Sequence, residues 1–395
     1  MSAEGSVRVG FILQPGDWLG GRIYLRNLLA AIGTLPDSPI TPVIFTGLRH
    51  PDASLDIRGT EIVASSQFDR KSLAWLAWKV TAKATSRDIV LGRLLRQHSL
   101  SVLSHSFHLG RQASVKTIGW IPDFQHLHLP EFFTPRERIL RDRQFKSICA
   151  NSDKIVVSSH CAHHDLLSFS PEHAHKAELL RFVASPIPLH NTIELAELQR
   201  LYNFDRPYFL LPNQFWAHKN HRVVIAALQK LKQQRKSVLV LATGSTQDYR
   251  NPTFFPSLMS YAAECDVKDR FRVLGKIPFD HLTSLMQHAL AFINPSWFEG
   301  WSTSVEEAKS MGKQIVLSDI PVHREQAPER GLFFPPDDSE ALAQALIEVS
   351  KRFDSHQDAS AQSQARARFP QRQRAFGEAY LAIIERLLNP ENLSN

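Results

Sequence analysis

The chain has 395 residues, with 46 Lys or Arg against 39 Asp or Glu, and a formal net charge of +7. This length exceeds what one small core supports and favours two domains. No apolar run approaches the ~18 residues that a bilayer span needs, and the start, MSAEGSVRVG, has no signal-peptide core. The cysteines lie far apart without metal-type pairing, so we expect a reduced cytoplasmic environment.

Buried strands alternate with helical stretches along nearly the whole chain, which predicts an α/β fold with doubly wound parallel sheets. Two strand–helix series of similar size indicate two Rossmann-like domains, at residues 1–204 and 205–367, followed by a last segment at 368–395 whose helix spans 371–388. The expected strands are 7–13, 42–46, 102–104, 115–121 and 155–158 in the first domain, and 208–211, 238–243, 271–274, 291–294 and 314–318 in the second.

Two glycines follow the first expected strand. Gly20 and Gly21 precede an expected helix at 22–32, so their backbone N–H groups can approach a phosphate or a sugar at the helix N-terminus. A simple tight turn accounts for the glycine pair equally well.

Two stretches of the first domain are candidates for contact with an anionic membrane surface. Residues 73–83 combine Trp75 and Trp78 with lysines, and residues 136–146 are strongly basic. A basic helix that carries Trp is the type that lies in a lipid interface. The alternatives are a core-facing helix for the first stretch and a solvated helix face for the second. Nucleic acid is a less suitable partner, because the basic residues are interspersed with acidic ones.

The loop WIPDFQHLHLPEFF at 120–133 begins where the strand 115–121 ends. A carboxylate or an imidazole in a cleft can assist the loss of a proton from a bound hydroxyl. We rank Asp123 and His126 above His128 for this role, because they lie nearer the end of the strand. The alternative is that these side chains cap the next helix or bind loop backbone.

No metal site is expected. Cys161 lies among three histidines, but no further ligand stands at metal-binding spacing, and we expect a polar helix start after the strand 155–158. An Asp-x-Asp motif, which would indicate a nucleotide held through a divalent cation, does not occur.

The second domain begins with the loop PNQFWAHKNH at 212–221, directly after the strand 208–211. Lys219 lies in this loop, at the carboxyl end of a strand, where open α/β sheets bind ligands. A solvated surface lysine is the alternative.

Two carboxylates stand at fixed spacing in the stretch from 292 to 325. Glu299 lies in a loop after the strand 291–294, and Glu307 lies in an expected helix at 303–311 that ends at Gly312 as its C-cap. Another buried strand, 314–318, follows. Both carboxylates therefore point toward the crevice at the carboxyl ends of the strands.

This arrangement resembles the donor-sugar signature of the family-4 (group 1) retaining glycosyltransferases of the GT-B fold. In that signature a Gly follows the first Glu and an Ala follows the second, as Gly300 and Ala308 do here. Ser318, Asp319 and Glu325 match the family's second donor loop. The resemblance implies two Rossmann-like domains that face each other across a cleft, with a terminal helix that crosses back to the first domain.

The resemblance also implies roles for individual residues. One of Glu299 and Glu307 would hold the hydroxyls of the donor sugar and the other the ribose, and Lys219 would neutralise the diphosphate. Gln214 replaces the family's Arg and lacks its charge, so Arg222 or His218 are candidate helpers. The implied catalytic residues are Asp123, His126, Lys219 and Glu299; the implied donor-binding residues are Gly20, Gly21, Gln214, Lys219, Asn220, Glu299, Gly300, Trp301, Ser302, Thr303 and Glu307.

We therefore interpret the chain as a retaining glycosyltransferase of cell-surface polysaccharide or lipopolysaccharide assembly. It would need no metal or other cofactor, and would use a GDP-, UDP- or dTDP-sugar and a glycan or lipid-diphosphate-linked acceptor. It would work in the cytoplasm, with attachment to the inner face of the membrane as an open possibility. Two alternatives stay open. A nucleotide-sugar epimerase would convert the donor alone, and a non-catalytic binding protein would leave the donor intact.

Overall fold

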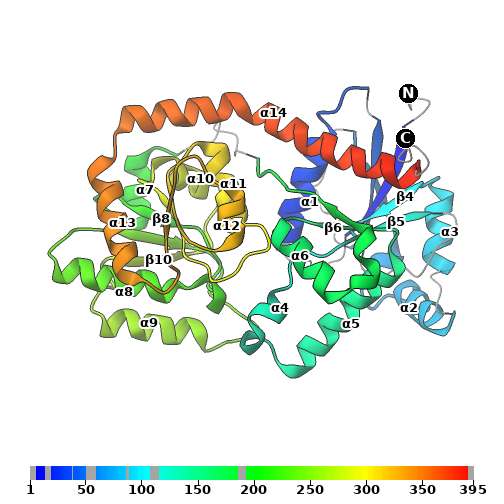
Figure 1. Cartoon of the computed structure of the whole chain (residues 1–395), viewed down its shortest axis with the longest axis horizontal. Helices are drawn as coiled ribbons and strands as arrows, with labels where there is room; N and C mark the ends of the chain where they lie inside the picture. The colour runs from blue at the N-terminus through cyan, green and yellow to red at the C-terminus, as the bar shows by residue number, and fades with distance from the viewer. Residues whose placement is uncertain are drawn as a thin grey trace. The chain divides into compact units, whose positions relative to one another are not determined.

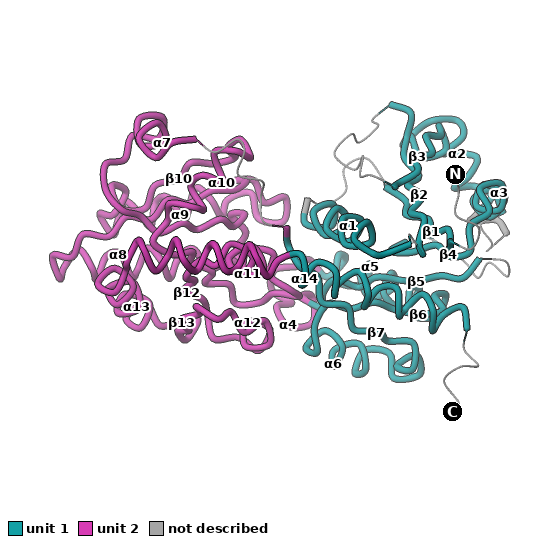
Figure 2. Tube along the Cα trace, turned by 90° about the horizontal axis from the view of Figure 1, so that it is seen from above, with its two compact units in different colours: residues 1–124, 135–184, 370–395 teal, residues 125–134, 185–369 magenta. Residues whose placement is uncertain are grey.

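The computed structural model describes two compact units, each built on a parallel β-sheet flanked by helices (Figures 1 and 2). Unit 1 comprises residues 1–124, 135–184 and 370–395, and unit 2 comprises residues 125–134 and 185–369. Unit 2 therefore includes two stretches, 125–134 and 185–204, that lie before the expected boundary at residue 204. The described residues are 6–13, 19–37, 39–49, 59–85, 89–106, 115–185 and 193–389.

Unit 1 contains a seven-stranded parallel sheet with the order β3-β2-β1-β4-β5-β6-β7. The apolar strand β1 lies near its centre and pairs with both β2 and β4. The strands are β1 (Val7–Ile12), β2 (Ile40–Thr46), β3 (Glu61–Ala64), β4 (Val102–Ser104), β5 (Lys116–Trp120), β6 (Lys154–Val157) and β7 (Ala177–Leu179). The helices before residue 185 are α1 (Leu19–Ile32), α2 (Leu73–Thr85), α3 (Ile89–Gln97), α4 (Gln125–His128), α5 (Pro135–Asn151) and α6 (His160–Phe169), of which α4 belongs to unit 2.

Unit 2 contains a six-stranded parallel sheet with the order β10-β9-β8-β11-β12-β13. The chain runs outward from β8 in one direction and then returns to β11 on the other side of β8, so the strand order reverses between β8 and β11. The strands are β8 (Phe209–Leu211), β9 (Val240–Thr243), β10 (Phe271–Gly275), β11 (Phe292–Asn294), β12 (Ile315–Ser318) and β13 (Gly331–Phe334). The helices are α7 (Leu195–Tyr202), α8 (His221–Gln233), α9 (Phe254–Glu264), α10 (Phe279–His288), α11 (Thr303–Met311), α12 (Pro321–Gln326), α13 (Ser339–Arg352) and α14 (Ser355–Leu388).

Helices cover both faces of the sheet in unit 2, and each face has its own apolar core. Along β8, Phe209 and Leu211 join one core, whereas Leu210 joins the other. This alternation follows from the two-residue period of a strand. The two cores fix the sheet between the helices, and the loops at the ends of its strands carry the polar side chains of the candidate site.

All ten expected strands are present, each within two residues of its expected ends. The helix at 303–311 is confirmed as α11, and Gly312 ends it with a left-handed φ of 68°. The strands β3, β7 and β13 were not predicted. The polar helix start at residue 160 is also confirmed, because Ser159 Oγ accepts a hydrogen bond from the Ala162 N–H at 3.0 Å and caps α6.

Two predictions about helix starts are wrong. Helix α1 begins at Leu19, so Gly20 and Gly21 lie in its first turn and not in a loop before it; residues 14–18 lie outside the described residues. Helix α14 begins at Ser355 and not at residue 371, because the preceding Ala- and Gln-rich stretch is helical. Alanine and glutamine are strong helix formers, which explains this extension. Residues 355–369 of α14 belong to unit 2 and residues 370–388 to unit 1.

Candidate functional site

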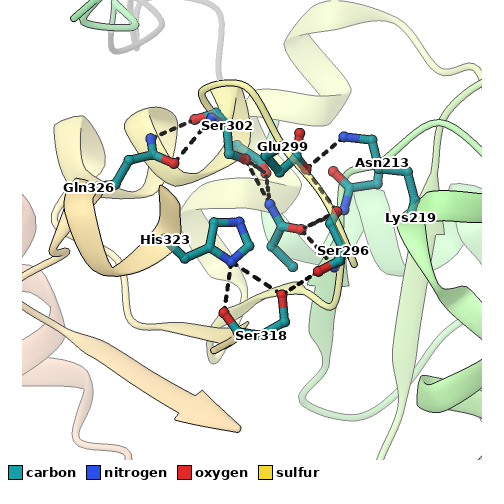
Figure 3. A network of polar contacts seen from close by, with 10 residues as sticks. Asn213, Lys219, Ser296, Glu299, Ser302, Ser318, His323 and Gln326 are labelled. Atoms are coloured by element: carbon teal, nitrogen blue, oxygen red, sulfur yellow. Dashed lines mark hydrogen bonds and ion pairs between the residues drawn. The ribbon is translucent and has the colours of Figure 1, made fainter. Parts of the chain in front are cut away.

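The candidate site lies in unit 2, in the loops that follow the adjacent strands β8 and β11 (Figure 3). Ligands of open α/β sheets bind at the carboxyl ends of the strands where the strand order reverses. Asn213 follows β8 and Asn294 ends β11, and the Asn213 side-chain amide donates to Asn294 Oδ1 at 3.4 Å. Both side chains are buried. The two loops are thus joined by a polar contact at the point where a ligand is expected.

Asn294 organises the loop that leads into α11. It is fully buried, and its Nδ2 donates to Ser302 Oγ at 2.7 Å and to Ser304 Oγ at 3.0 Å. Its Oδ1 accepts a hydrogen bond from the Ser296 backbone N–H at 3.3 Å. Because buried polar groups are costly unless they are paired, these bonds fix the path of the chain between Asn294 and Ser304. Glu299 lies on this fixed path.

Lys219 and Glu299 form an ion pair across the two loops, with Lys219 Nζ 2.7 Å from Glu299 Oε1. Their side chains are only 14% and 9% exposed. Ser296 Oγ lies a further 2.7 Å from the same Glu299 oxygen. Burial opposes ionisation of Glu299, but the Lys219 charge and the hydrogen bonds from Lys219 and Ser296 hold its pKa below the ordinary value. Glu299 is therefore a carboxylate at neutral pH.

The Lys219 loop is held by its own local structure. Lys219 ends a short 3-10 turn, and Asn220 follows in the left-handed region with a φ of 51° before α8 begins at His221. Asparagine tolerates this conformation better than most residues. The Asn220 side chain also donates to the Pro336 carbonyl at 2.8 Å, which ties the turn to the loop after β13.

Glu307 and its neighbour Glu306 differ in their environments. Glu306 is 1% exposed and accepts hydrogen bonds from Lys309 Nζ and Gln326 Nε2, each at 3.1 Å. Glu307 is half-buried, and its carboxyl has no hydrogen bond or ion pair within the part of the chain that the structure describes. Burial raises the pKa of Glu307 to about 7. Glu306 is thus part of the scaffold, whereas the Glu307 carboxyl is available for a contact with a ligand.

Sequence reasoning missed His323, which is fully buried beside the ion pair. Its Nδ1 lies 2.8 Å from the Ser318 carbonyl oxygen, which can only accept, so Nδ1 carries the proton. Burial lowers the pKa of His323 to about 4, so the ring is neutral at neutral pH. Gln326 was also missed; it exchanges two hydrogen bonds with the Ser302 backbone, at 3.1 and 3.0 Å.

The candidate helpers of Lys219 are engaged elsewhere. Gln214 accepts a hydrogen bond from the Ser245 N–H at 2.8 Å, and the Arg222 guanidinium lies 3.6 Å from the centre of the Tyr261 ring. Burial and the nearby Lys219 charge lower the pKa of His218 well below its ordinary value, so it is neutral. Lys219 therefore supplies the positive charge next to Glu299 in this loop.

The candidate residues from the first half of the chain fall in both units. Asp123 is half-buried in unit 1, three residues beyond β5. His126 lies in α4, within unit 2, and is only 1% exposed. Burial of this degree keeps His126 from contacting a substrate in the described conformation.

Metal-binding clusters and membrane-spanning helices are both absent from the described ranges. No three His, Cys, Asp or Glu side chains are grouped so as to hold a metal ion there. No helix in those ranges has both the length and the hydropathy that a membrane span requires.

Comparison with solved structures establishes the fold. A glycosyltransferase from Rickettsia africae superposes with a TM-score of 0.67 at 15% identity, covering 97% of this chain and 99% of that one. The Anabaena protein HepE, solved in complex with UDP-glucose, superposes with a TM-score of 0.65 at 15% identity, covering 97% of this chain and 99% of that one. The predicted GT-B fold is therefore confirmed.

Comparison with sequences concerns a narrower part of the chain. The O-antigen chain mannosyltransferase RfbU of Salmonella typhimurium is 28% identical over 145 residues, which are 36% of this chain and 38% of that protein. Residues 198–366 match the family model described as glycosyl transferases group 1. The matched residues include Lys219, Glu299 and Glu307.

Proposed function

We propose that the protein is a retaining glycosyltransferase that moves a sugar from a nucleotide sugar to a glycan or lipid-linked acceptor in cell-surface polysaccharide assembly. The observation that carries this proposal is the buried Lys219–Glu299 pair at the strand-order reversal of unit 2. Support comes from the Salmonella relative, named as an O-antigen chain mannosyltransferase, and from HepE, which was solved with UDP-glucose.

In this proposal the donor takes over the contacts that Lys219 and Glu299 make with each other. The Lys219 ammonium would bind the diphosphate, where negative charge grows as the sugar leaves. The Glu299 carboxylate would accept hydrogen bonds from hydroxyls of the donor sugar. The Lys219 ammonium thus lies where the donor sugar would contact Glu299, and the Glu299 carboxylate lies where the diphosphate would contact Lys219. Donor binding replaces one ion pair by two sets of charge-assisted contacts, which are stronger than neutral hydrogen bonds.

The remaining roles follow from the placement of the side chains. Glu307, with its unpaired carboxyl, would accept hydrogen bonds from the ribose hydroxyls. Asp123, which is half-buried, is a better candidate than the buried His126 to assist the acceptor hydroxyl. Retention of configuration would follow from attack on the face that the diphosphate leaves, as the family resemblance implies.

The exposed surface of unit 1 supports attachment to an anionic membrane. Leu73, Leu76 and Val80 of α2 are 85%, 46% and 65% exposed, and their spacing places them on one face of the helix. Trp78 does not join them, because it is 1% exposed and packs against Phe68 in the core. For Trp78 the alternative of a core-facing helix therefore holds.

Helix α5 carries a similar exposed surface. Its Ile139 and Leu140 are 51% and 53% exposed, next to the exposed Arg136 and Arg143. Exposed apolar side chains flanked by basic ones are typical of helices that lie at a lipid interface. We therefore propose that α2 and α5 form the membrane contact.

The first prediction concerns the two members of the ion pair. Lys219→Ala should lower transfer by a factor of a hundred or more, about 3 kcal/mol, and weaken the binding of UDP or GDP. Glu299→Gln should also lose transfer, yet bind the nucleotide more tightly, because the ammonium is no longer shared with a carboxylate. Calorimetry with UDP, GDP and dTDP measures affinity, and product analysis measures transfer.

Lys232→Ala is the matched control, because it removes a lysine of the same unit from a surface ion pair with Asp266. If wild type binds the nucleotide more tightly than Glu299→Gln does, Glu299 does not compete with the diphosphate for Lys219. If product analysis finds an epimer after incubation with the donor alone, epimerisation and not transfer becomes the proposed reaction.

The second prediction is that transfer persists in EDTA. Lys219 and the free N–H groups at helix starts would neutralise the diphosphate without a divalent cation. Transfer rates with and without EDTA, and after addition of Mg²⁺ or Mn²⁺, provide the measurement. Loss of transfer on chelation, with recovery on adding either metal, would overturn this proposal.

The third prediction uses the raised pKa of Glu307. A carboxyl whose pKa is higher in the folded than in the unfolded protein destabilises the fold once pH exceeds the unfolded value. The cost therefore grows from the ordinary pKa of Glu to about 7 and is complete above that pH. Glu307→Gln should melt at a higher temperature than wild type near about pH 8, and at the same temperature near about pH 4.

The same variant should bind nucleotide more weakly at the higher pH, where wild type presents a full carboxylate. Melting curves with and without UDP or GDP across this pH range test both statements. Equal melting temperatures of the two proteins at high pH would show that Glu307 ionises without cost in the fold.

The fourth prediction is that the protein floats with anionic vesicles and not with neutral ones. Each basic residue near an anionic surface contributes about 1 kcal/mol, and this attraction weakens as salt shortens the Debye length. The triple variant Leu73→Gln/Leu76→Gln/Val80→Gln should float less than wild type at the same salt concentration. If wild type floats with neither anionic nor neutral vesicles, a soluble acceptor is favoured.

A further inference from the structure

Residues 125–134 lie between two segments of unit 1 in the chain, but they pack within unit 2. This crossing segment, as we call it, consists of α4 and the 3-10 turn Pro130–Phe132. Arg250, in the loop after β9, holds it in place: its Nη1 donates to Gln125 Oε1 at 3.2 Å, and its guanidinium lies 5.3 Å from the centre of the Phe133 ring. The crossing segment is thereby fixed beside the loops of the donor site.

Aromatic rings join the crossing segment to the loop that carries Glu299. Phe132 stacks on Trp297, with ring centres 6.1 Å apart and planes at 15°, and His128 lies 5.1 Å from Phe298. Trp297 and Phe298 directly precede Glu299 in the chain. We call His128, Phe132, Trp297 and Phe298 the aromatic platform.

Trp297 is fixed in position at both its backbone and its side chain. Its backbone N–H donates to the His218 carbonyl at 2.9 Å, and its indole N–H donates to Asp337 Oδ1 at 2.7 Å. His218 directly precedes Lys219, so the platform is attached to both loops of the ion pair. A ring held in this way is preorganised to contact a ligand.

The platform is more exposed than the aromatic pairs in the core of unit 2. Phe215 with His221 and Phe204 with Tyr208 are closed pairs of buried rings. The four platform side chains are instead half-buried or exposed. Apolar surface left exposed in a cluster, with a carboxylate at its edge, is typical of a binding site.

The chemistry of the platform fits a saccharide. The C–H face of a pyranose ring packs on an aromatic ring, and its hydroxyls donate to a carboxylate such as Asp337. In the proposed reaction the attacking hydroxyl must come next to the sugar that Glu299 holds, and the platform begins at the residue before Glu299. We infer that the aromatic platform binds the sugar of the acceptor, which makes the acceptor a glycan at its reacting end. This inference rests on the proposed glycosyl transfer.

The experiment measures sugar binding and nucleotide binding separately. Methyl α-glycosides of mannose, glucose and galactose serve as probes by saturation-transfer NMR, with UDP or GDP present. At least one glycoside should bind wild type through its C–H protons. Trp297→Ala and Phe132→Ala should weaken that binding by roughly fivefold or more, which is the scale of one aromatic contact, and Trp297→Phe should retain most of it.

Tyr249→Ala is the matched control, because Tyr249 is an aromatic residue of unit 2 that is 75% exposed and lies outside the platform. Its glycoside binding should equal that of wild type, and every variant should keep wild-type affinity for the nucleotide. Absence of glycoside binding, or binding unchanged in Trp297→Ala, would overturn the platform. A parallel loss of nucleotide affinity in Trp297→Ala would assign Trp297 a structural role instead. Absence of nucleotide binding to wild type would overturn the proposed function separately.

Discussion

The buried Lys219–Glu299 ion pair is the constraint on which the candidate site depends. Two charges that are largely removed from water need each other, and removal of one partner from such a pair typically costs about 3–5 kcal/mol. Replacement of both partners by apolar residues is often neutral, so stability alone gives little reason for the pair. The surrounding polar scaffold, from Asn294 to Ser296, holds Glu299 within reach of Lys219.

The histidines around the pair support it by remaining uncharged. His218, His221 and His323 are buried, and burial lowers the pKa of all three. A positive charge on any of them would repel Lys219 or attract Glu299 away from it. At neutral pH they fill space without changing the local charge. The positive charge beside Glu299 is therefore set by Lys219.

Local patterns in the sequence predicted the parts of the site that depend on local structure. The strand ends, the helix at 303–311 and the Glu299–Glu307 spacing all follow from short-range periodicity. The three strands that were missed, β3, β7 and β13, lie at sheet edges and are short and partly exposed, so they lack a continuous apolar run. His323 and Gln326 were missed because their partners are far away in sequence or on the backbone, and only folding brings these groups together.

The division of α14 between the units has a consequence for synthesis on the ribosome. Tyr380 in its second half is buried and donates to Ser104 Oγ at 2.8 Å, and Phe376, Ile383 and Ile384 are also buried. Two segments of unit 1 are therefore translated before residues 185–369 of unit 2, but its core is completed by residues translated after them. Domains generally fold as they emerge, N-terminal first. Here unit 2 has all its segments before unit 1 does, so the order of completion is reversed, and a nonsense mutation near residue 370 would damage the unit that was made first.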